Sequence, residues 1–143
     1  MTSASLPVAT GKPPYVAAAI ASVVVLALYV LTLAPTTAMW DTSEYIAAAY
    51  RMSLPHPPGN PLFILIGRVF TLLPIAPTIA ERVNLLAAIT SALSAGLWFL
   101  VTERILRTWV EDRWQRLLGA VLATLNGAGA FTVWNQSVVN EKV

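Results

Sequence analysis

The side chains best suited to chemistry in this sequence are two carboxylates, Asp41 and Glu44, and the single histidine, His56. The carboxylates are three residues apart, a spacing that places both on one face of a helix. Such a pair can act as a general base and as a ligand for a sugar or a divalent cation. The spacing is also that of a capping box, with Asp41 as N-cap and Glu44 at N3, which the pattern alone favours. The two interpretations are compatible.

His56 lies in a proline-braced segment, Leu54-Pro55-His56-Pro57-Pro58-Gly59-Asn60-Pro61. A rigid turn could present its imidazole to a substrate, and an imidazole titrates near neutral pH. The alternative is a solvent-facing loop histidine, which the sequence alone favours. Asn60 followed by Pro61 is a suitable N-cap and N1 pair, so a new helix is expected to begin there.

Arg82 and a separate group of four arginines could each contact lipid. Arg82 lies at the start of an uncharged run, where it could clamp the phosphate of a lipid carrier, anchor to a headgroup or pair with Glu81. The second group comprises Arg104, Arg107, Arg113 and Arg116. It is interpreted as a topology signal that contacts anionic lipid.

Composition excludes several classes of protein. The chain has 143 residues, of which 57% are hydrophobic and 11% are charged. Soluble domains are about 25% charged, so neither a soluble globule nor a disordered chain is expected. The absence of cysteine excludes disulfides and thiolate sites, and one histidine excludes a multi-histidine metal centre. A net charge of +2 is too small to argue for a nucleic-acid partner.

The elements that would position these residues are uncharged apolar runs of membrane length. They predict an all-α integral membrane protein with three transmembrane helices at about 15–34, 79–102 and 117–134. The first run is longer than the apolar core of a typical signal peptide. The other expected parts are a flexible cytoplasmic tail (1–14) and, within one membrane domain (15–143), an outer loop (35–78) with interfacial helices at about 42–52 and 61–73.

Charge placement predicts the orientation. Four arginines in the segment 103–116 put that segment on the cytoplasmic side. The loop 35–78 then lies on the periplasmic side of a bacterial inner membrane, and the last residues return to that side. Asp41, Glu44, His56 and Glu141 are therefore expected in one compartment.

Several segments together resemble a known family. They are Trp40-Asp41-Thr42-Ser43-Glu44-Tyr45, Pro55-His56-Pro57-Pro58-Gly59-Asn60-Pro61-Leu62, Arg82-Val83-Asn84-Leu85-Leu86, Trp134 and Val139-Asn140-Glu141-Lys142-Val143. In this order they resemble the N-terminal part of a bacterial membrane family of unknown function. That family is similar to the transmembrane protein O-mannosyltransferase and belongs to the C-type glycosyltransferases.

The resemblance implies a sugar donor carried on polyprenyl or dolichyl phosphate. It implies Asp41 as the base that activates an acceptor hydroxyl, with Glu44 supporting it or helping to bind a divalent cation. His56 and Asn60 would shape the loop near the donor, and Arg82 would face the lipid phosphate. Glu141 would be a second acid on the outer side.

Two functional hypotheses follow. Three spans can hardly enclose a lipid-linked donor and an acceptor, so the chain is either the N-terminal portion of a longer glycosyltransferase or a truncated, non-catalytic relative. The relative would be a structural transmembrane subunit of a photosynthetic or respiratory assembly, and small-residue runs at 17–19 and 127–130 suit packing against other subunits. A transporter is disfavoured because no charge lies within a span.

Overall fold

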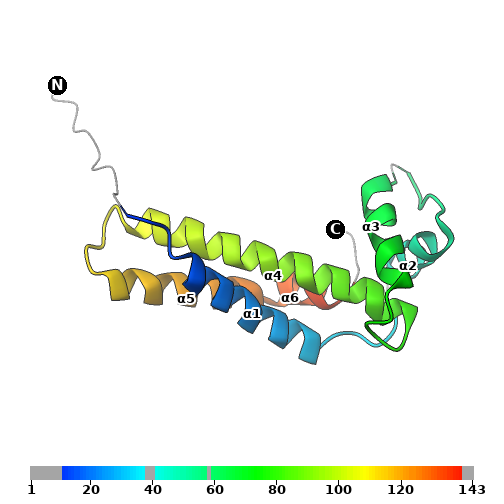
Figure 1. Cartoon of the computed structure of the whole chain (residues 1–143), viewed down its shortest axis with the longest axis horizontal. Coiled ribbons are helices and arrows are strands. Elements are labelled where there is room, and N and C mark those ends of the chain that lie inside the picture. Colours follow the sequence, from blue (N-terminus) through cyan, green and yellow to red (C-terminus); the bar gives the residue numbers. More distant parts are fainter. Residues whose placement is uncertain (1–10, 38–40, 58, 140–143) are drawn as a thin grey trace, which may run out of the picture.

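The computed structural model describes residues 11–37, 41–57 and 59–139 (Figure 1). Within these ranges the chain forms helices and no strand, which confirms the all-α prediction. The helices are α1 (Tyr15–Leu31), α2 (Thr42–Arg51), α3 (Pro61–Leu72), α4 (Ile79–Leu106), α5 (Arg113–Gly129) and α6 (Phe131–Val138).

The long helices α1, α4 and α5 run side by side along the long axis of the molecule and form a bundle (Figure 1). Small residues allow this close approach. A Cβ added at Gly96 of α4 would collide with the hydroxyl of Ser22 and lie 3.2 Å from the carbonyl of Ala18, both on α1. The core between the helices is built on Val25, Tyr29, Ala88 and Ala92.

Helices α2 and α3 form a separate pair at one end of the bundle, which we call the cap (Figure 1). Tyr45 and Ala48 of α2 pack against Ile64 of α3. A second cluster, which includes Ile46, Ala49 and Val83, joins the cap to the start of α4. Pro61 occupies the first turn of α3, where its missing N–H costs nothing.

Helix α4 begins with the chain's capping box. The hydroxyl of Thr78 accepts a hydrogen bond from the Glu81 N–H at 3.1 Å, and the Glu81 carboxylate accepts one from the Thr78 N–H at 2.9 Å. This arrangement satisfies two backbone donors that no helical carbonyl can reach. The start of the longest helix is therefore fixed by its own side chains.

One helix in the described part of the chain, α4, is long and apolar enough to cross a membrane alone. Helices α5 and α6 meet that criterion only together, and they are bent by 66°. Helix α1 is apolar but has 17 residues. The three-span arrangement therefore stays an expectation.

The third expected span, 117–134, is not continuous. Helix α5 begins earlier, at Arg113, and ends at Gly129, and Ala130 has an extended ψ of 131° before α6 begins. The Tyr29 hydroxyl donates a hydrogen bond of 2.9 Å to the carbonyl of Ala128. That carbonyl lies in the last turn of α5, where no helical N–H follows to bind it.

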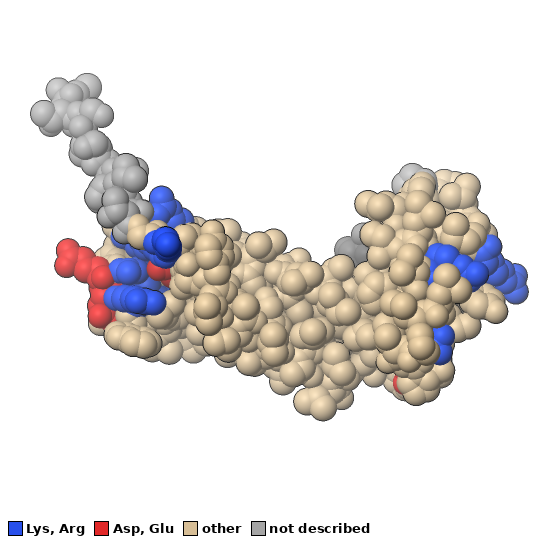
Figure 2. All heavy atoms as spheres, viewed as in Figure 1, with Lys and Arg blue, Asp and Glu red and all other residues tan. Residues whose placement is uncertain are grey.

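The space-filling view shows where charge gathers. On the face in Figure 2, Lys, Arg, Asp and Glu lie at the two ends of the long axis, and the surface between them carries other residues. The end at the cap carries the site described next, and the end at the α4–α5 turn carries the arginine cluster.

Candidate functional site

The structure brings three of the predicted site residues together, and we call Asp41, Glu44 and His56 the His56 cluster. The imidazole of His56 lies between the two carboxylates. Its Nδ1 is 2.8 Å from Glu44 Oε2, and its Nε2 is 3.5 Å from Asp41 Oδ2. The backbone N–H of His56 also donates to Glu44 Oε1 at 2.6 Å. Glu44 therefore holds His56 by both its backbone and its ring.

A chain reversal after α2 makes this arrangement possible. Asp41 precedes the first residue of α2, and Glu44 lies in the first turn. Met52 ends the helix in a left-handed conformation, with φ of 57°, and the Ser53 N–H bonds back to the Ala48 carbonyl at 3.1 Å. The following residues then run back along the helix, so His56 reaches its N-terminal turn.

Aromatic packing supports the imidazole from one side. The ring of Tyr45 meets that of His56 edge to face, with centroids 6.1 Å apart. Tyr45 in turn meets Phe63 of α3 at 5.7 Å. Because Tyr45 is buried, it places the exposed imidazole against the rigid body of the cap.

The capping-box interpretation of Asp41 and Glu44 is wrong. Asp41 is the N-cap residue by position, but its side chain makes no capping hydrogen bond. The Glu44 carboxylate bonds to His56, 12 residues away, rather than to the start of its own helix. The backbone N–H and the ring Nδ1 of His56 therefore occupy both carboxylate oxygens of Glu44.

The electrostatics of the cluster separate the roles of its two acids. Hydrogen bonds from the ring and the backbone of His56 hold the pKa of Glu44 below its ordinary value of 4.5. Glu44 is therefore an anion at neutral pH, and a neutral imidazole with its proton assigned to Nδ1 would donate that proton to it. In the neutral ring, Nε2 is then an acceptor facing another acceptor, Asp41, so the tautomer assigned by this network leaves room for a proton or a cation between them.

The cluster has the composition of a cation site. One ligand atom from each of the three residues lies within 4.8 Å of the other two. Carboxylate oxygens and an imidazole nitrogen are common ligands for divalent metals in proteins. All three side chains are 41–43% exposed, so a substrate or an ion can reach them.

Asn60 precedes α3 of the cap, and Arg82 lies in the first turns of α4. The Asn60 carbonyl accepts from the Ile64 N–H at the start of α3, while the Asn60 side chain caps nothing. The Arg82 guanidinium donates to the carbonyls of Ala76 and Thr71 at 2.8 and 3.0 Å. Neither side chain bonds to the His56 cluster.

The structure decides one alternative for Arg82 and leaves another open. Pairing of Arg82 with Glu81 is wrong, because Glu81 serves the capping box and Arg82 bonds to carbonyls. The contacts with Thr71 and Ala76 tie the end of α3 to α4, and the phosphate-binding role stays a prediction. Glu141 and Trp40 lie outside the described residues.

Sequence reasoning gave no role to Asn84, which is fully buried in α4. Its side-chain amide donates to the carbonyls of Ala34 and Thr36 at 3.0 and 3.3 Å. These bonds fix the chain as it leaves α1 and approaches Asp41. The signal in the sequence was a single amide at the start of an otherwise apolar run.

Comparison with known proteins identifies the family. The family profile of the protein O-mannosyl-transferase TMEM260 N-terminal domain matches residues 41–143, beginning at the first acid of the cluster. The chain belongs to this family. The predicted relation to O-mannosyltransferases is therefore confirmed, while the bacterial origin stays a prediction.

Two relatives illustrate the extent of the similarity to the TMEM260 family. Protein O-mannosyl-transferase TMEM260 of Mus musculus is 39% identical over 82 residues, which cover 57% of this chain. Protein O-mannosyl-transferase tmem260 of Dictyostelium discoideum is 27% identical over 101 residues, or 69% of this chain. The matched region spans 12% of the length of each relative. No solved structure matches the chain.

Proposed function

We propose that this chain is the N-terminal portion of a membrane O-mannosyltransferase and that the His56 cluster lies at its catalytic site. The donor would be mannose on a polyprenyl phosphate, and the acceptor would be a hydroxyl group. Membership of the TMEM260 family supports the reaction class. The observation that carries the proposal is the imidazole held between two exposed carboxylates.

In the proposed reaction, the acceptor oxygen attacks the anomeric carbon of the donor sugar. The bond between that carbon and the phosphate oxygen breaks, the polyprenyl phosphate leaves, and the hydroxyl proton passes to Asp41. Asp41 suits this role because its carboxylate is 41% exposed and accepts no capping hydrogen bond. A base within reach of the acceptor contributes typically about 10²–10⁴-fold to the rate.

Glu44 is the positioning residue in this proposal. Its pKa is lowered by two hydrogen bonds from His56, so it is a weaker base than an ordinary glutamate. Its anionic form keeps the proton of the imidazole on Nδ1 and turns Nε2 toward Asp41. In this proposal Asp41 therefore accepts the proton, and Glu44 orients His56.

A divalent cation fits the same residues. Asp41, Glu44 and His56 would hold it, because one ligand atom from each of them lies within 4.8 Å of the other two. When bound, such an ion would stabilise negative charge on the departing phosphate. Asn60 precedes α3, and Arg82 lies near the start of α4. We propose that these two residues line the donor site.

We also propose that the bundle crosses a membrane with the His56 cluster on its outer side and the N-terminus on the cytoplasmic side. The bundle axis separates two charged ends (Figure 2). The apolar helix α4 is 28 residues long, or roughly 42 Å, which exceeds one hydrocarbon thickness. The arginines of the α4–α5 turn lie at the end opposite the cap, as the positive-inside rule requires.

The donor class can be tested with the purified native polypeptide that contains this chain. Transfer of labelled mannose to a peptide hydroxyl is measured from polyprenyl-phosphate mannose and, separately, from a nucleotide-diphosphate mannose. We expect transfer from the lipid-linked donor only, and chelation of divalent ions should reduce it. Equal transfer from the nucleotide sugar would contradict the proposal.

The second candidate, a structural transmembrane subunit of a larger complex, is favoured by exposed apolar side chains along the bundle. Val16 and Ile20 of α1 and Leu93 and Leu97 of α4 are each 60–76% exposed. Lipid or a neighbouring helix could cover them. Stoichiometric co-purification with a defined membrane complex, combined with no mannose transfer, would favour this candidate over the enzyme.

A further inference from the structure

A cleft of about 700 Å³ opens at the end of the bundle opposite the His56 cluster. It lies between the start of α1 and the start of α5, and we call it the Arg113 cleft. Its charged lining residues are Lys12, Glu103, Arg107, Arg113 and Arg116. Four cations therefore face one carboxylate, and the acids of the adjacent turn, Glu111 and Asp112, do not line the cleft.

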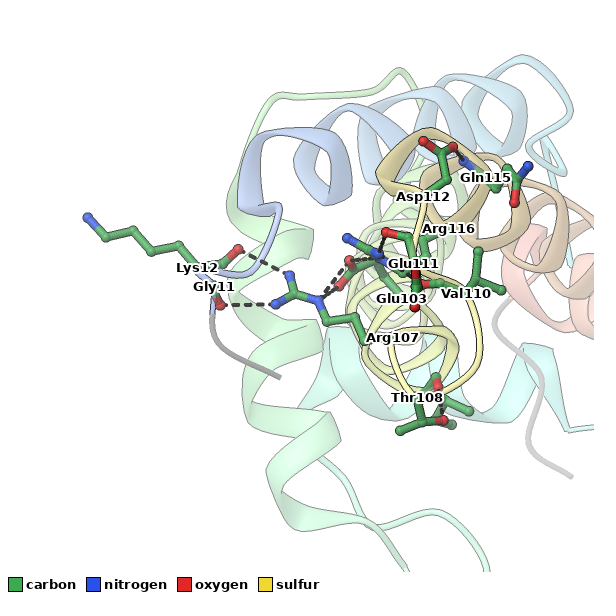
Figure 3. Close-up of polar contacts among 11 residues, drawn as sticks. Gly11, Lys12, Glu103, Arg107, Thr108, Val110, Glu111, Asp112, Gln115 and Arg116 are labelled. Atoms are coloured by element: carbon green, nitrogen blue, oxygen red, sulfur yellow. Dashed lines mark hydrogen bonds and ion pairs between the residues drawn. The ribbon is translucent and has the colours of Figure 1, made fainter. Parts of the chain in front are cut away.

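Two of these cations already have partners. Arg107 Nε lies 2.8–2.9 Å from both oxygens of the buried Glu103, and Arg116 Nε lies 3.4 Å from one of them (Figure 3). Arg107 also donates to the carbonyls of Gly11 and Lys12, and Arg116 donates to the carbonyls of the α4–α5 turn. These contacts hold the two walls of the cleft together.

The other two cations are available to a ligand. Among the described residues, the side chains of Lys12 and Arg113 make no hydrogen bond or ion pair. Figure 3 shows the Lys12 side chain extending away from the contacts of Arg107 and Glu103. Because the Glu103 charge is already shared by two arginines, the cleft as a whole has an unbalanced positive charge.

The rest of the lining is apolar. Tyr15, Val16 and Ile20 line the cleft from α1 and are 60–76% exposed, and Leu117 lines it from α5. The free positive charge lies where these helices begin, and the apolar wall extends along α1. The cleft therefore matches a molecule with an anionic head and an apolar tail.

We propose that the Arg113 cleft binds one anionic phospholipid, with its phosphate against Lys12 and Arg113 and an acyl chain along Val16 and Ile20. The proposal rests on the membrane placement proposed above and not on mannose transfer. A free phosphate shares the head chemistry but cannot use the apolar wall, so the two sources can be separated.

The test uses the purified native polypeptide that contains this chain, in detergent, with bound lipid counted by native mass spectrometry. Phosphatidylglycerol is titrated against phosphatidylcholine, and inorganic phosphate is added as a competitor. We expect one retained phosphatidylglycerol and much weaker retention of phosphatidylcholine. Each of Lys12→Gln and Arg113→Gln should weaken phosphatidylglycerol binding by about fivefold. Ile20→Ser should also weaken it.

Arg104→Gln is the matched control, because it removes the same charge at the same end without lining this cleft. We expect it to leave phosphatidylglycerol binding unchanged. Far-UV circular dichroism of each variant checks that the helices are retained. Equal losses in Arg104→Gln, equal retention of phosphatidylcholine, or full competition by inorganic phosphate with no effect of Ile20→Ser would each overturn the proposal.

Discussion

The two ends of the bundle use acids and cations in different ways. At the α4–α5 end, Glu103 is 4% exposed, and Arg107 and Arg116 surround it. At the cap, the imidazole and both carboxylates are 41–43% exposed. A buried charge must be paired to be tolerated, whereas an exposed one need not be. The Glu103 group is therefore a paired, buried set of charges, and the imidazole of the His56 cluster stays accessible to solvent.

The largest effect that separates the two ends is expected from Asp41→Asn. This change removes the proposed base and keeps the shape of the side chain, so mannose transfer should fall by about 10²–10⁴-fold. Thermal stability should change by less than about 1 kcal/mol, because the contact of Asp41 with His56 is exposed and 3.5 Å long. Transfer is measured with the lipid-linked donor.

Asp112→Asn is the control at the other end. Asp112 caps α5 through a 2.8 Å bond to the Gln115 N–H, and asparagine can cap equally well. We expect normal transfer and normal stability. A comparable loss of transfer in both variants would remove the functional distinction between the two ends.

The second-largest effect is expected from Glu103→Gln, which should lower the free energy of unfolding. It leaves the largely buried guanidiniums of Arg107 and Arg116 without their counter-charge, which typically costs about 3–5 kcal/mol. Thermal and chemical unfolding in detergent measure the loss, with Glu111→Gln on the adjacent exposed turn as the control. A loss as small as that of Glu111→Gln would show that burial does not distinguish the Glu103 group.

The smallest effect is expected from protonation of Glu44 at low pH, which should remove its contribution to stability. Because the folded state lowers its pKa, the contribution of Glu44 to stability is present above the unfolded value and is lost as the pH falls through the folded value. A carboxyl-carbon NMR titration should give a midpoint below 4.5, with parallel loss of protection at the His56 amide. A midpoint at or above 4.5 would mean that Glu44 does not hold His56.

The sequence predicted the elements best where proline and charge mark their ends. Pro61 begins α3, and the arginines 104–116 mark the turn between α4 and α5. The break at Ala130 was missed because hydropathy is continuous across it, although Gly127 and Gly129 weaken the helix there. Local composition therefore predicts where helices form more reliably than how they bend.

The candidate site was predicted as a set of residues but not as a set of contacts. Asp41-x-x-Glu44 and Thr78-x-x-Glu81 have the same spacing, yet only the second forms a capping box. The difference arises because His56 returns to Glu44 from 12 residues away, which no local spacing can encode. The burial of Glu103 was also missed. Its i,i+4 spacing to Arg107 is visible in the sequence, but its contact with Arg116, 13 residues away, is not.

The most direct test of Asp41 as the base replaces the acceptor hydroxyl with azide, a nucleophile that has no proton to lose. In the Asp41→Asn variant, whose amide oxygen can still bind a cation but cannot take up a proton as a carboxylate does, we expect transfer to a peptide hydroxyl to be lost and formation of mannosyl azide from the lipid-linked donor to persist. Equal loss of both reactions would contradict the account, because Asp41 would then serve the donor or the fold rather than remove the acceptor proton.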